Sequence, residues 1–292
     1  MPTTLTCESP CKVNLLLNIL GKRADGFHEL ETLIHPVPYC DRLELERRTA
    51  GIELGCNHPT LPVDSSNLVH RATTSFFRRT GIDAGVRIHL EKRIPVAAGL
   101  GGGSGNAATT LLGLNEMFGH PLTPLQLHET AAELGSDVPF FLQDKPALAT
   151  GRGETIAPLD FFPALRGTFM LLIHPGFGIS TPWAYQQLTR FPEVLNGRRG
   201  RAMNLVERLQ TSRLEEAVAD FYNALEAPAL KKYPVLALYQ EFLKTNGAVA
   251  ALMSGSGSTT FAIVTSEKDC DDLKEKFPSR FGAEVWMAAV RL

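Results

Sequence analysis

The chain has 292 residues, of which 44% are hydrophobic and 21% are charged, so it can bury the core of one large or two ordinary globular domains. A formal net charge of −2 argues against general binding to nucleic acid or a membrane surface. The five cysteines form no C-x-x-C pair, which favours thiols in a reducing compartment over a disulfide framework or a zinc site. The sequence shows neither a signal-peptide pattern nor an apolar run of membrane-spanning length, so we expect a cytoplasmic protein.

The first predicted element is a strand over Cys11–Gly21, an apolar stretch interrupted by polar residues. Lys12 and Asn14 are two residues apart and therefore share one face of that strand. Taken by themselves, these residues are explained by an edge strand with one solvated face, which would also accommodate Asn18.

The pair Asp25-Gly26 predicts a turn. Phe27 and His28 follow directly, and an aromatic beside a histidine at such a place is commonly turn packing. Two further elements are predicted before the middle of the chain: a strand over Leu43–Arg48, and a helix over Asn67–Thr80 with Ser65 or Ser66 as its cap and Gly81 at its end.

The most informative stretch is a glycine-rich loop between a predicted strand, Val86–Ile94, and a predicted helix. Four of the five residues from Gly99 to Gly103 are glycine, and an apolar helical run follows them. Ser104 or Asn106 can supply the N-cap of that helix. Glycines let a backbone approach a ligand closely, and helix N-terminal N–H groups attract anions. The loop is therefore predicted to hold a di- or triphosphate, in preference to a flexible surface loop.

Two common nucleotide motifs are excluded at this loop. A P-loop requires Gly-Lys-Ser or Gly-Lys-Thr, which occurs nowhere in the chain, and the dinucleotide fingerprint fails because Ser104 stands where its third glycine belongs.

Beyond the loop, Thr123 and Pro124 open a predicted helix that runs to about Leu134. Asp137 then stands between a Gly-Ser turn and an apolar Val-Pro-Phe-Phe run. Capping of a short helix is one interpretation of this aspartate.

The second half of the chain follows a plausible domain boundary near Pro158–Arg166. Its predicted elements are a strand over Phe169–Ile173, a helix capped by Thr181 and running through Tyr185, a solvated basic loop over Asn196–Arg201, helices over Ser212–Asn223 and Ala227–Leu243, a strand–turn–strand unit over Ala248–Val264, a helix near Asp269–Phe277 and a strand over Val285–Val290.

The string Gly-Leu-Gly-Gly-Gly-Ser-x-Asn-Ala-Ala resembles the phosphate loop of the GHMP small-molecule kinases. Further segments resemble one branch, the 4-diphosphocytidyl-2-C-methyl-D-erythritol kinases: Ser-Pro-x-Lys-x-Asn near the start, Arg-x-Asp-Gly-Phe-His after it, Gly-x-Asp-Val-Pro-Phe and Ala-x-x-x-Gly-x-Gly in the middle, and a His-Pro-Gly turn followed by Thr-Pro in the second half. Met-Ser-Gly-Ser-Gly-Ser near the end resembles the last GHMP motif. The resemblance covers most of the first half of the chain and two short motifs of the second.

The resemblance implies an α+β, two-domain GHMP kinase fold, with a ribosomal protein S5 domain 2-like N-terminal domain, a ferredoxin-like C-terminal domain and the active site in the interdomain cleft. On this basis, residues 1–160 would be the ATP-binding domain and residues 161–292 the substrate domain. The implied reaction is phosphorylation by ATP of the 2-hydroxyl of 4-diphosphocytidyl-2-C-methyl-D-erythritol. Asp137 and Lys12 would be the catalytic pair, and Asp137 could also cap.

The resemblance also implies the binding residues. Asn14, Phe27, His28, Thr181 and Tyr185 would bind the substrate, with Phe27 and Tyr185 stacking on its cytosine; core packing is the alternative for Tyr185. The residues implied for ATP are Asn67, Lys92, Pro95, Val96, Ala97, Ala98, Gly99, Leu100, Gly101, Gly102, Gly103, Ser104, Gly105 and Asn106.

Mg²⁺ would accompany ATP, but its protein ligands stay open. The family usually has a second serine where this chain has Gly105, so that contact cannot be carried over, and Ser104 or water would replace it. The expected partner is the small-molecule substrate, without nucleic acid or membrane, in a monomer or weak homodimer. Two alternatives remain: a sibling kinase of the homoserine or mevalonate type, and a nucleotide-binding protein without turnover.

Overall fold

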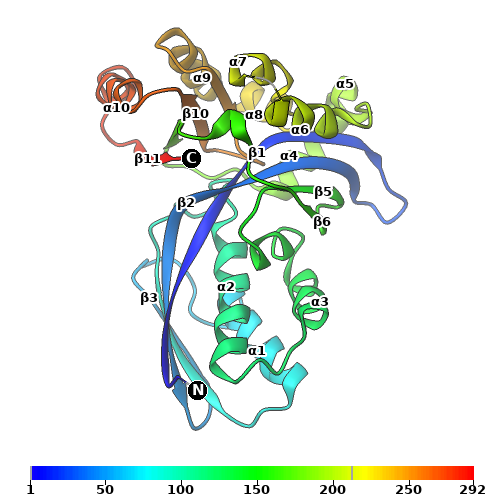
Figure 1. Ribbon diagram of the computed structural model, residues 1–292, viewed down its shortest axis with the longest axis vertical. Helices are drawn as coiled ribbons and strands as arrows, with labels where there is room; N and C mark the ends of the chain where they lie inside the picture. Colours follow the sequence, from blue (N-terminus) through cyan, green and yellow to red (C-terminus); the bar gives the residue numbers. More distant parts are fainter. Residues whose placement is uncertain (1, 212) are drawn as a thin grey trace. The chain divides into compact units, whose positions relative to one another are not determined.

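The computed structural model describes residues 2–211 and 213–292 (Figure 1). The chain divides into two compact units that interleave in sequence. Unit 1 holds the residues up to Cys11 with Tyr39–Pro95 and Gly101–Asp144, and unit 2 holds Lys12–Pro38, Val96–Leu100 and Lys145–Leu292. The two long strands β1 (Thr4–Lys22) and β2 (His28–Arg48) each contribute one part to each unit.

Unit 1 is a layer of strands covered by helices on one face (Figure 1). Strand β4 (Gly85–Glu91) pairs antiparallel with Arg42–Arg48 of β2 and parallel with β3 (Ile52–Cys56). The side chains alternate between buried and exposed along these strands: Leu43, Leu45 and Ile88 are buried, and Glu44, Arg87 and His89 are exposed. This alternation is expected of strands that have one face covered. The helices are α1 (Leu68–Thr80), α2 (Gly102–Met117), α3 (Pro124–Leu134) and the short η1 (Pro139–Leu142).

Helix ends in unit 1 follow local chemistry. Thr123 caps α3 and Gly81 ends α1, both as predicted. The structure adds that Thr123 forms a reciprocal capping box with Gln126 and that Gly81 is left-handed, with φ 66°. The predicted cap of α1 at Ser65 or Ser66 is wrong, because the side chain of Asn67 accepts the bond from Val69 N.

The start of α2 also differs from the prediction. The N-cap is Gly101, with φ 69°, and the helix begins at Gly102 without a side-chain cap. Ser104 and Asn106 lie inside the helix, so neither is its N-cap. The preceding strand is shorter than predicted and ends at Glu91.

Unit 2 contains an antiparallel four-stranded sheet in the order β11-β7-β10-β9. Its strands are β7 (Phe169–His174), β9 (Ala250–Met253), β10 (Thr260–Val264) and β11 (Trp286–Arg291). Helices α9 (Val235–Thr245) and α10 (Glu267–Phe281) pack against this sheet. Their apolar side chains, among them Leu243 and Phe277, belong to the core of the unit.

The remaining strands of unit 2 belong to the same sheet as the second half of β1. Tyr222–Asn223 (β8) pairs parallel with Leu16–Leu17, β5 (Ala147–Gly151) pairs with Leu30–Ile34 of β2, and β6 (Thr155–Pro158) pairs with β5. Strand β1 therefore lies between β2 and β8. The interpretation as an edge strand with a solvated face is wrong, since Lys12, Asn14 and Asn18 are at most 4% exposed.

Several helices of unit 2 differ from the predictions. Ser180 rather than Thr181 caps α4 (Thr181–Gln187), and Arg201, the last residue of the basic loop, begins the unpredicted helix α6 (Arg201–Thr211). The predicted helix over Ser212–Asn223 is in fact α7 (Leu214–Ala217), η4 (Val218–Asp220) and strand β8; Ser212 itself lies outside the described residues. Pro234 divides the other predicted helix into α8 (Glu226–Lys232) and α9.

Short elements complete the described chain: η2 (Pro163–Leu165), η3 (Leu188–Arg190) and α5 (Pro192–Leu195). Within residues 2–211 and 213–292, no helix has the length and apolar character needed to cross a bilayer.

Candidate active site

The glycine-rich loop has an unusual backbone. Ala97, Gly99 and Gly101 all have positive φ, at 54°, 77° and 69°. A left-handed alanine is uncommon in proteins and is held in place only by its surroundings. The glycine run thus contains residues that need positive φ, at Gly99 and Gly101, whereas Gly102 and Gly103 are helical and the sequence gives no signal for Ala97.

In unit 2, the loop residues Val96–Leu100 pack against the turn between β9 and β10, residues 254–259. Ser254 Oγ donates to Gly99 O at 2.9 Å, and Thr259 N donates to Ala98 O at 3.1 Å. A Cβ on Gly99 would lie 2.2 Å from Ser254 O. Because backbone meets backbone at this point, glycine is required at position 99.

The β9–β10 turn is itself held by a residue that the sequence analysis did not single out. Asn223 Nδ2 donates to Met253 O at 2.8 Å and to Gly255 O at 2.7 Å, and Asn223 Oδ1 accepts from Leu225 N. Asn223 is 2% exposed, so these bonds replace the water that its amide would otherwise need. The only local signal for this role is an amide in a largely apolar segment.

The N-terminus of α2 in unit 1 is free of a side-chain cap, which leaves its first N–H groups available to an anion. A Cβ on Gly103 would meet only Leu68 Cδ1 within 4 Å, at 3.6 Å, whereas one on Gly102 would lie 3.1 Å from Ile94 and 3.2 Å from Lys92 Nζ. The first turn of the helix is therefore open at Gly103 and closely packed at Gly102.

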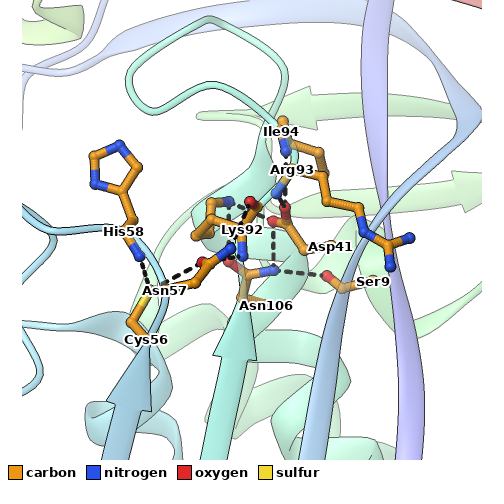
Figure 2. A network of polar contacts seen from close by, with 9 residues as sticks. All are labelled: Ser9, Asp41, Cys56, Asn57, His58, Lys92, Arg93, Ile94 and Asn106. Carbon is orange, nitrogen blue, oxygen red and sulfur yellow. Dashed lines mark hydrogen bonds and ion pairs between the residues drawn. The ribbon is translucent and has the colours of Figure 1, made fainter.

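A buried polar network lies beneath this helix end (Figure 2). Asp41, which is fully buried, pairs with Lys92 Nζ and accepts from Asn106 Nδ2 at 2.9 Å. Its other oxygen accepts from the backbone N–H groups of Arg93 and Ile94, at 2.7 and 2.8 Å. Asp41 thus links the segment before the glycine loop to the first turns of α2 by hydrogen bonds. The sequence analysis did not predict this role of Asp41.

The network determines what Lys92 and Asn106 do in this structure. Asn106 Oδ1 accepts from Lys92 Nζ at 3.3 Å, and Asn106 Nδ2 also donates to Ser9 Oγ at 3.0 Å. The Lys92 side chain is only 5% exposed. The side chains of Lys92 and Asn106 therefore form hydrogen bonds within the protein in this structure. The side chain of Asn67 is also engaged within the protein, because it caps α1 and donates to Pro62 O.

Gly105 lies where the surrounding structure leaves no room for a Cβ. A Cβ at position 105 would lie 2.8 Å from Pro10 O and 3.1 Å from Ser9 Oγ, so a serine would not fit without a backbone shift. Among the described residues, no cluster of three or more His, Cys, Asp or Glu could hold a metal ion. Mg²⁺ does not need such a cluster, because it keeps several waters and binds through phosphates and one or two protein oxygens. Ser104 is partly buried, and its hydroxyl is an oxygen of that kind.

Lys12 and Asn14 come together in unit 2, as their spacing predicts. Lys12 Nζ donates to Asn14 Oδ1 at 2.6 Å, and Asn14 Nδ2 donates to Thr32 Oγ1 at 2.8 Å. A Cβ on Gly255 would lie 3.3 Å from both Lys12 Nζ and Asn14 Oδ1. The β9–β10 turn therefore passes directly over this pair.

Two of the residues predicted to bind the substrate, His28 and Tyr185, are in ring contact in unit 2. The ring centroids of His28 and Tyr185 are 5.3 Å apart, and the exposed ring of Phe27 lies under the guanidinium of Arg152 at 4.8 Å. Partial burial and the nearby Lys22 lower the pKa of His28 below 6.5. In the same unit, the hydroxyls of Thr181 and Ser256 are 2.8 Å apart.

Asp137 lies in unit 1, half-buried, between α3 and η1. The N-cap residue of η1 is Val138. The interpretation of Asp137 as a cap of η1 is therefore wrong.

Comparison with known proteins gives a consistent result. The family model described as the GHMP kinases N terminal domain matches residues 67–145, and the GHMP kinases C terminal model matches residues 193–283. The 4-diphosphocytidyl-2-C-methyl-D-erythritol kinase of Methylacidiphilum infernorum is 42% identical over 287 residues, which cover 96% of this chain and 93% of that protein. Its counterpart from Acaryochloris marina is 38% identical, with 91% and 89% coverage.

Solved structures show the same relationship. A crystal structure of 4-(cytidine 5'-diphospho)-2C-methyl-D-erythritol kinase has a TM-score of 0.80 and 33% identity, and the match covers 99% of this chain and 100% of that one. Homoserine kinase from Cytophaga hutchinsonii has a TM-score of 0.74 but only 18% identity, with 99% and 94% coverage. The second likeness is one of fold alone, and the predicted two-domain GHMP kinase fold is confirmed.

Proposed function

Because the chain belongs to the 4-diphosphocytidyl-2-C-methyl-D-erythritol kinase family of the GHMP kinases, we propose that it transfers the γ-phosphoryl group of ATP to the 2-hydroxyl of 4-diphosphocytidyl-2-C-methyl-D-erythritol. This reaction belongs to non-mevalonate isoprenoid precursor synthesis. The observation that carries the proposal is the identity of about two fifths with such kinases over nine tenths or more of this chain.

The acceptor hydroxyl needs a base, and we assign this role to Asp137. In the reaction, the 2-hydroxyl oxygen bonds to the γ-phosphorus, the bond from that phosphorus to the β–γ bridging oxygen breaks, and the hydroxyl proton passes to the Asp137 carboxylate. The ammonium of Lys12 offsets negative charge on the transferring group. Positioning and charge stabilisation together supply on the order of 10 kcal/mol of barrier reduction.

ATP is assigned to the glycine-rich loop and the N-terminus of α2. The positive φ values of the loop, the absence of a side-chain cap on α2 and the open space at Gly103 support a phosphate cradle. Mg²⁺ would be held by the phosphates, water and the Ser104 hydroxyl, and when bound it neutralises phosphate charge. Lys92 and Asn106 contribute by holding the loop segment in place through Asp41.

The cytidylyl substrate is assigned to unit 2. The contact between His28 and Tyr185, with Phe27 beside His28 in the chain, supports an aromatic site for a pyrimidine base. Thr181, next to Ser256, is assigned to the same substrate. Asn14 contributes through its bond to Lys12.

One experiment tests the function. Purified protein is given ATP and Mg²⁺ with 4-diphosphocytidyl-2-C-methyl-D-erythritol, homoserine or mevalonate, and phosphorylated product is measured for each. We expect turnover with the cytidylyl substrate alone. Turnover with homoserine or mevalonate would favour a sibling kinase, and ATP binding without any turnover would favour a regulatory nucleotide-binding protein.

The domain boundary and assembly complete the proposal. We assign residues 1–160 to the ATP-binding domain, which also contributes Asn14, Phe27 and His28 to the substrate site, and residues 161–292 to the substrate domain, in a cytoplasmic monomer or weak homodimer. Sedimentation equilibrium over a range of protein concentrations measures the assembly. A tight complex of higher order would contradict that part of the proposal.

A further inference from the structure

Three hydrogen bonds form a line between neighbouring parts of β1 and β2 in unit 2. Lys12 Nζ donates to Asn14 Oδ1 at 2.6 Å, Asn14 Nδ2 donates to Thr32 Oγ1 at 2.8 Å, and Thr32 Oγ1 donates to Leu16 O at 2.6 Å. Lys12, Asn14 and Thr32 are all at most 4% exposed. Buried polar groups of this kind depend on one another for hydrogen bonds, because bulk water does not reach them.

The chemistry of the donors gives this line a direction. A threonine hydroxyl has one proton, and here the carbonyl oxygen of Leu16 accepts it. Thr32 Oγ1 must therefore present a lone pair to Asn14, so the amide has to turn its NH₂ group toward Thr32. The amide oxygen of Asn14 then faces Lys12, whose ammonium has only protons to offer.

We propose that Thr32 is a positioning residue for phosphoryl transfer, because it fixes the orientation of the Asn14 amide and thereby the position of the Lys12 ammonium. The proposal rests on the proposed function, in which Lys12 offsets charge on the transferring group. Without the Thr32 hydroxyl, the Asn14 NH₂ group loses its acceptor, and the amide can rotate away from its present plane. Lys12 Nζ would then lose the acceptor that Asn14 supplies.

The surroundings of the pair make this orientation matter. Gly255 of the β9–β10 turn lies so close that a Cβ there would be 3.3 Å from both Asn14 Oδ1 and Lys12 Nζ. An ammonium that loses its acceptor on one side therefore has little space on the other. Since electrostatic stabilisation depends on charges placed in advance, a displaced Lys12 lowers the rate of phosphoryl transfer.

The test compares Thr32→Val, which keeps the shape of the side chain and removes the hydroxyl, with Thr32→Ser, which keeps the hydroxyl. We expect Thr32→Val to lower kcat about tenfold, a loss of roughly 1.4 kcal/mol of transition-state stabilisation, with KM for ATP and for the acceptor within about twofold. Thr32→Ser should have a kcat within about twofold of the wild-type value. A wild-type kcat in Thr32→Val, or an equal loss in both variants, would overturn the proposal.

A matched control comes from unit 1. Thr73 is fully buried, and its hydroxyl donates to Val69 O at 2.9 Å, so Thr73→Val removes a comparable bond on α1. We expect this variant to lose stability without a change in kcat. If its kcat falls as far as that of Thr32→Val, general loosening explains both results and the proposal is wrong.

A second measurement does not depend on activity. The free energy of unfolding is measured for Thr32→Val, Asn14→Leu and the double variant. Because the two residues share one bond, the losses should not add; additive losses would overturn the proposed coupling. Failure of the proposed function is distinguishable, since it shows in the wild type as turnover of another acceptor or of none, whereas this coupling is read from unfolding alone.

Discussion

The rings of His28 and Tyr185 lie 5.3 Å apart, centroid to centroid, at an interplanar angle of 33°. His28 begins β2 and Tyr185 lies in the middle of α4, so the contact joins two distant parts of the chain. Phe27 precedes His28 and is 52% exposed, which leaves an aromatic surface available beside the pair. The guanidinium of Arg152 covers part of that ring and is expected to hold it in place.

The first prediction concerns these aromatic residues. Phe27→Ala or Tyr185→Ala should weaken binding of the cytidylyl substrate by roughly 5- to 100-fold, because stacking of a base on an aromatic side chain is worth about 1–3 kcal/mol. ATP should be little affected, and the two losses should not add. The measurement is Kd for each nucleotide in both single variants and the double variant.

The control for the aromatic site is Phe161→Ala, which truncates a phenylalanine of similar exposure, 55%, in the same unit. It should leave both affinities unchanged. Equal weakening of ATP and the cytidylyl substrate in Phe27→Ala would indicate general destabilisation, and unchanged binding of both would remove the aromatic site.

The second prediction concerns Asp137. Asp137→Asn should lower kcat by a factor of roughly a hundred or more while ATP still binds, because the amide cannot accept the proton of the acceptor hydroxyl. Steady-state kinetics and ATP titration measure the two effects. Asp83→Asn, at an exposed position in the same unit, is the matched control, and near-normal turnover of Asp137→Asn would reject the catalytic role.

The third prediction concerns the first turn of α2. Gly103→Val should weaken ATP binding by about tenfold or more, since the open space at this position is where the phosphates are assigned and about 1.4 kcal/mol is tenfold. Gly103 is a better target than Gly102, whose Cβ would press on Ile94 and Lys92. Steric exclusion is the whole cause, because of the loop glycines only Gly99 and Gly101 have positive φ.

Leu112→Val is the control for this helix, at a partly exposed position nearer its end, where the side chain is 39% exposed. Both variants are checked by thermal unfolding and by ATP titration. A folded Gly103→Val variant with an unchanged nucleotide Kd would show that the phosphates bind elsewhere.

The fourth prediction concerns stability at low pH. Burial lowers the pKa of His35 from 6.5 to about 4, although the bond between Nδ1 and Pro36 O at 2.7 Å opposes this. The unfolded chain therefore binds a proton at higher pH than the folded one. His35 contributes full stability above pH 6.5, and this is lost as the pH falls toward 4, by roughly 3 kcal/mol in total at 1.36 kcal/mol per pKa unit.

Urea unfolding between pH 7 and pH 4 measures this loss. His35→Gln should reduce the slope, and the remainder should include His174, whose pKa burial also lowers to about 4. His89→Gln, at an exposed position on β4, is the control and should leave the slope as in the wild type. A wild-type slope in His35→Gln would contradict the assignment.

Local signals account for the features that the sequence alone determined. The glycine run predicted a close approach of backbone to a ligand, but the positive φ expected at Gly102 or Gly103 is wrong, since it occurs at Gly99 and Gly101. The Thr123 cap was predictable because capping partners lie within one turn. The Lys12–Asn14 pair was predictable because strand side chains alternate. The motifs built from these residues also indicated the family. Each of these signals lies within a few residues of chain, where covalent geometry restricts the outcome.

The tertiary structure decided which distant side chains meet. Asp41 ties Lys92 to Asn106, Asn223 holds the β9–β10 turn, and Thr32 orients Asn14. Nothing in the neighbouring residues marks these roles, because strand register and helix packing bring the partners together. The same cause made Ser104 and Asn106 poor candidates for the N-cap: once Gly101 adopts the left-handed conformation, α2 starts at Gly102, and the Asn106 amide is turned toward the buried carboxylate of Asp41.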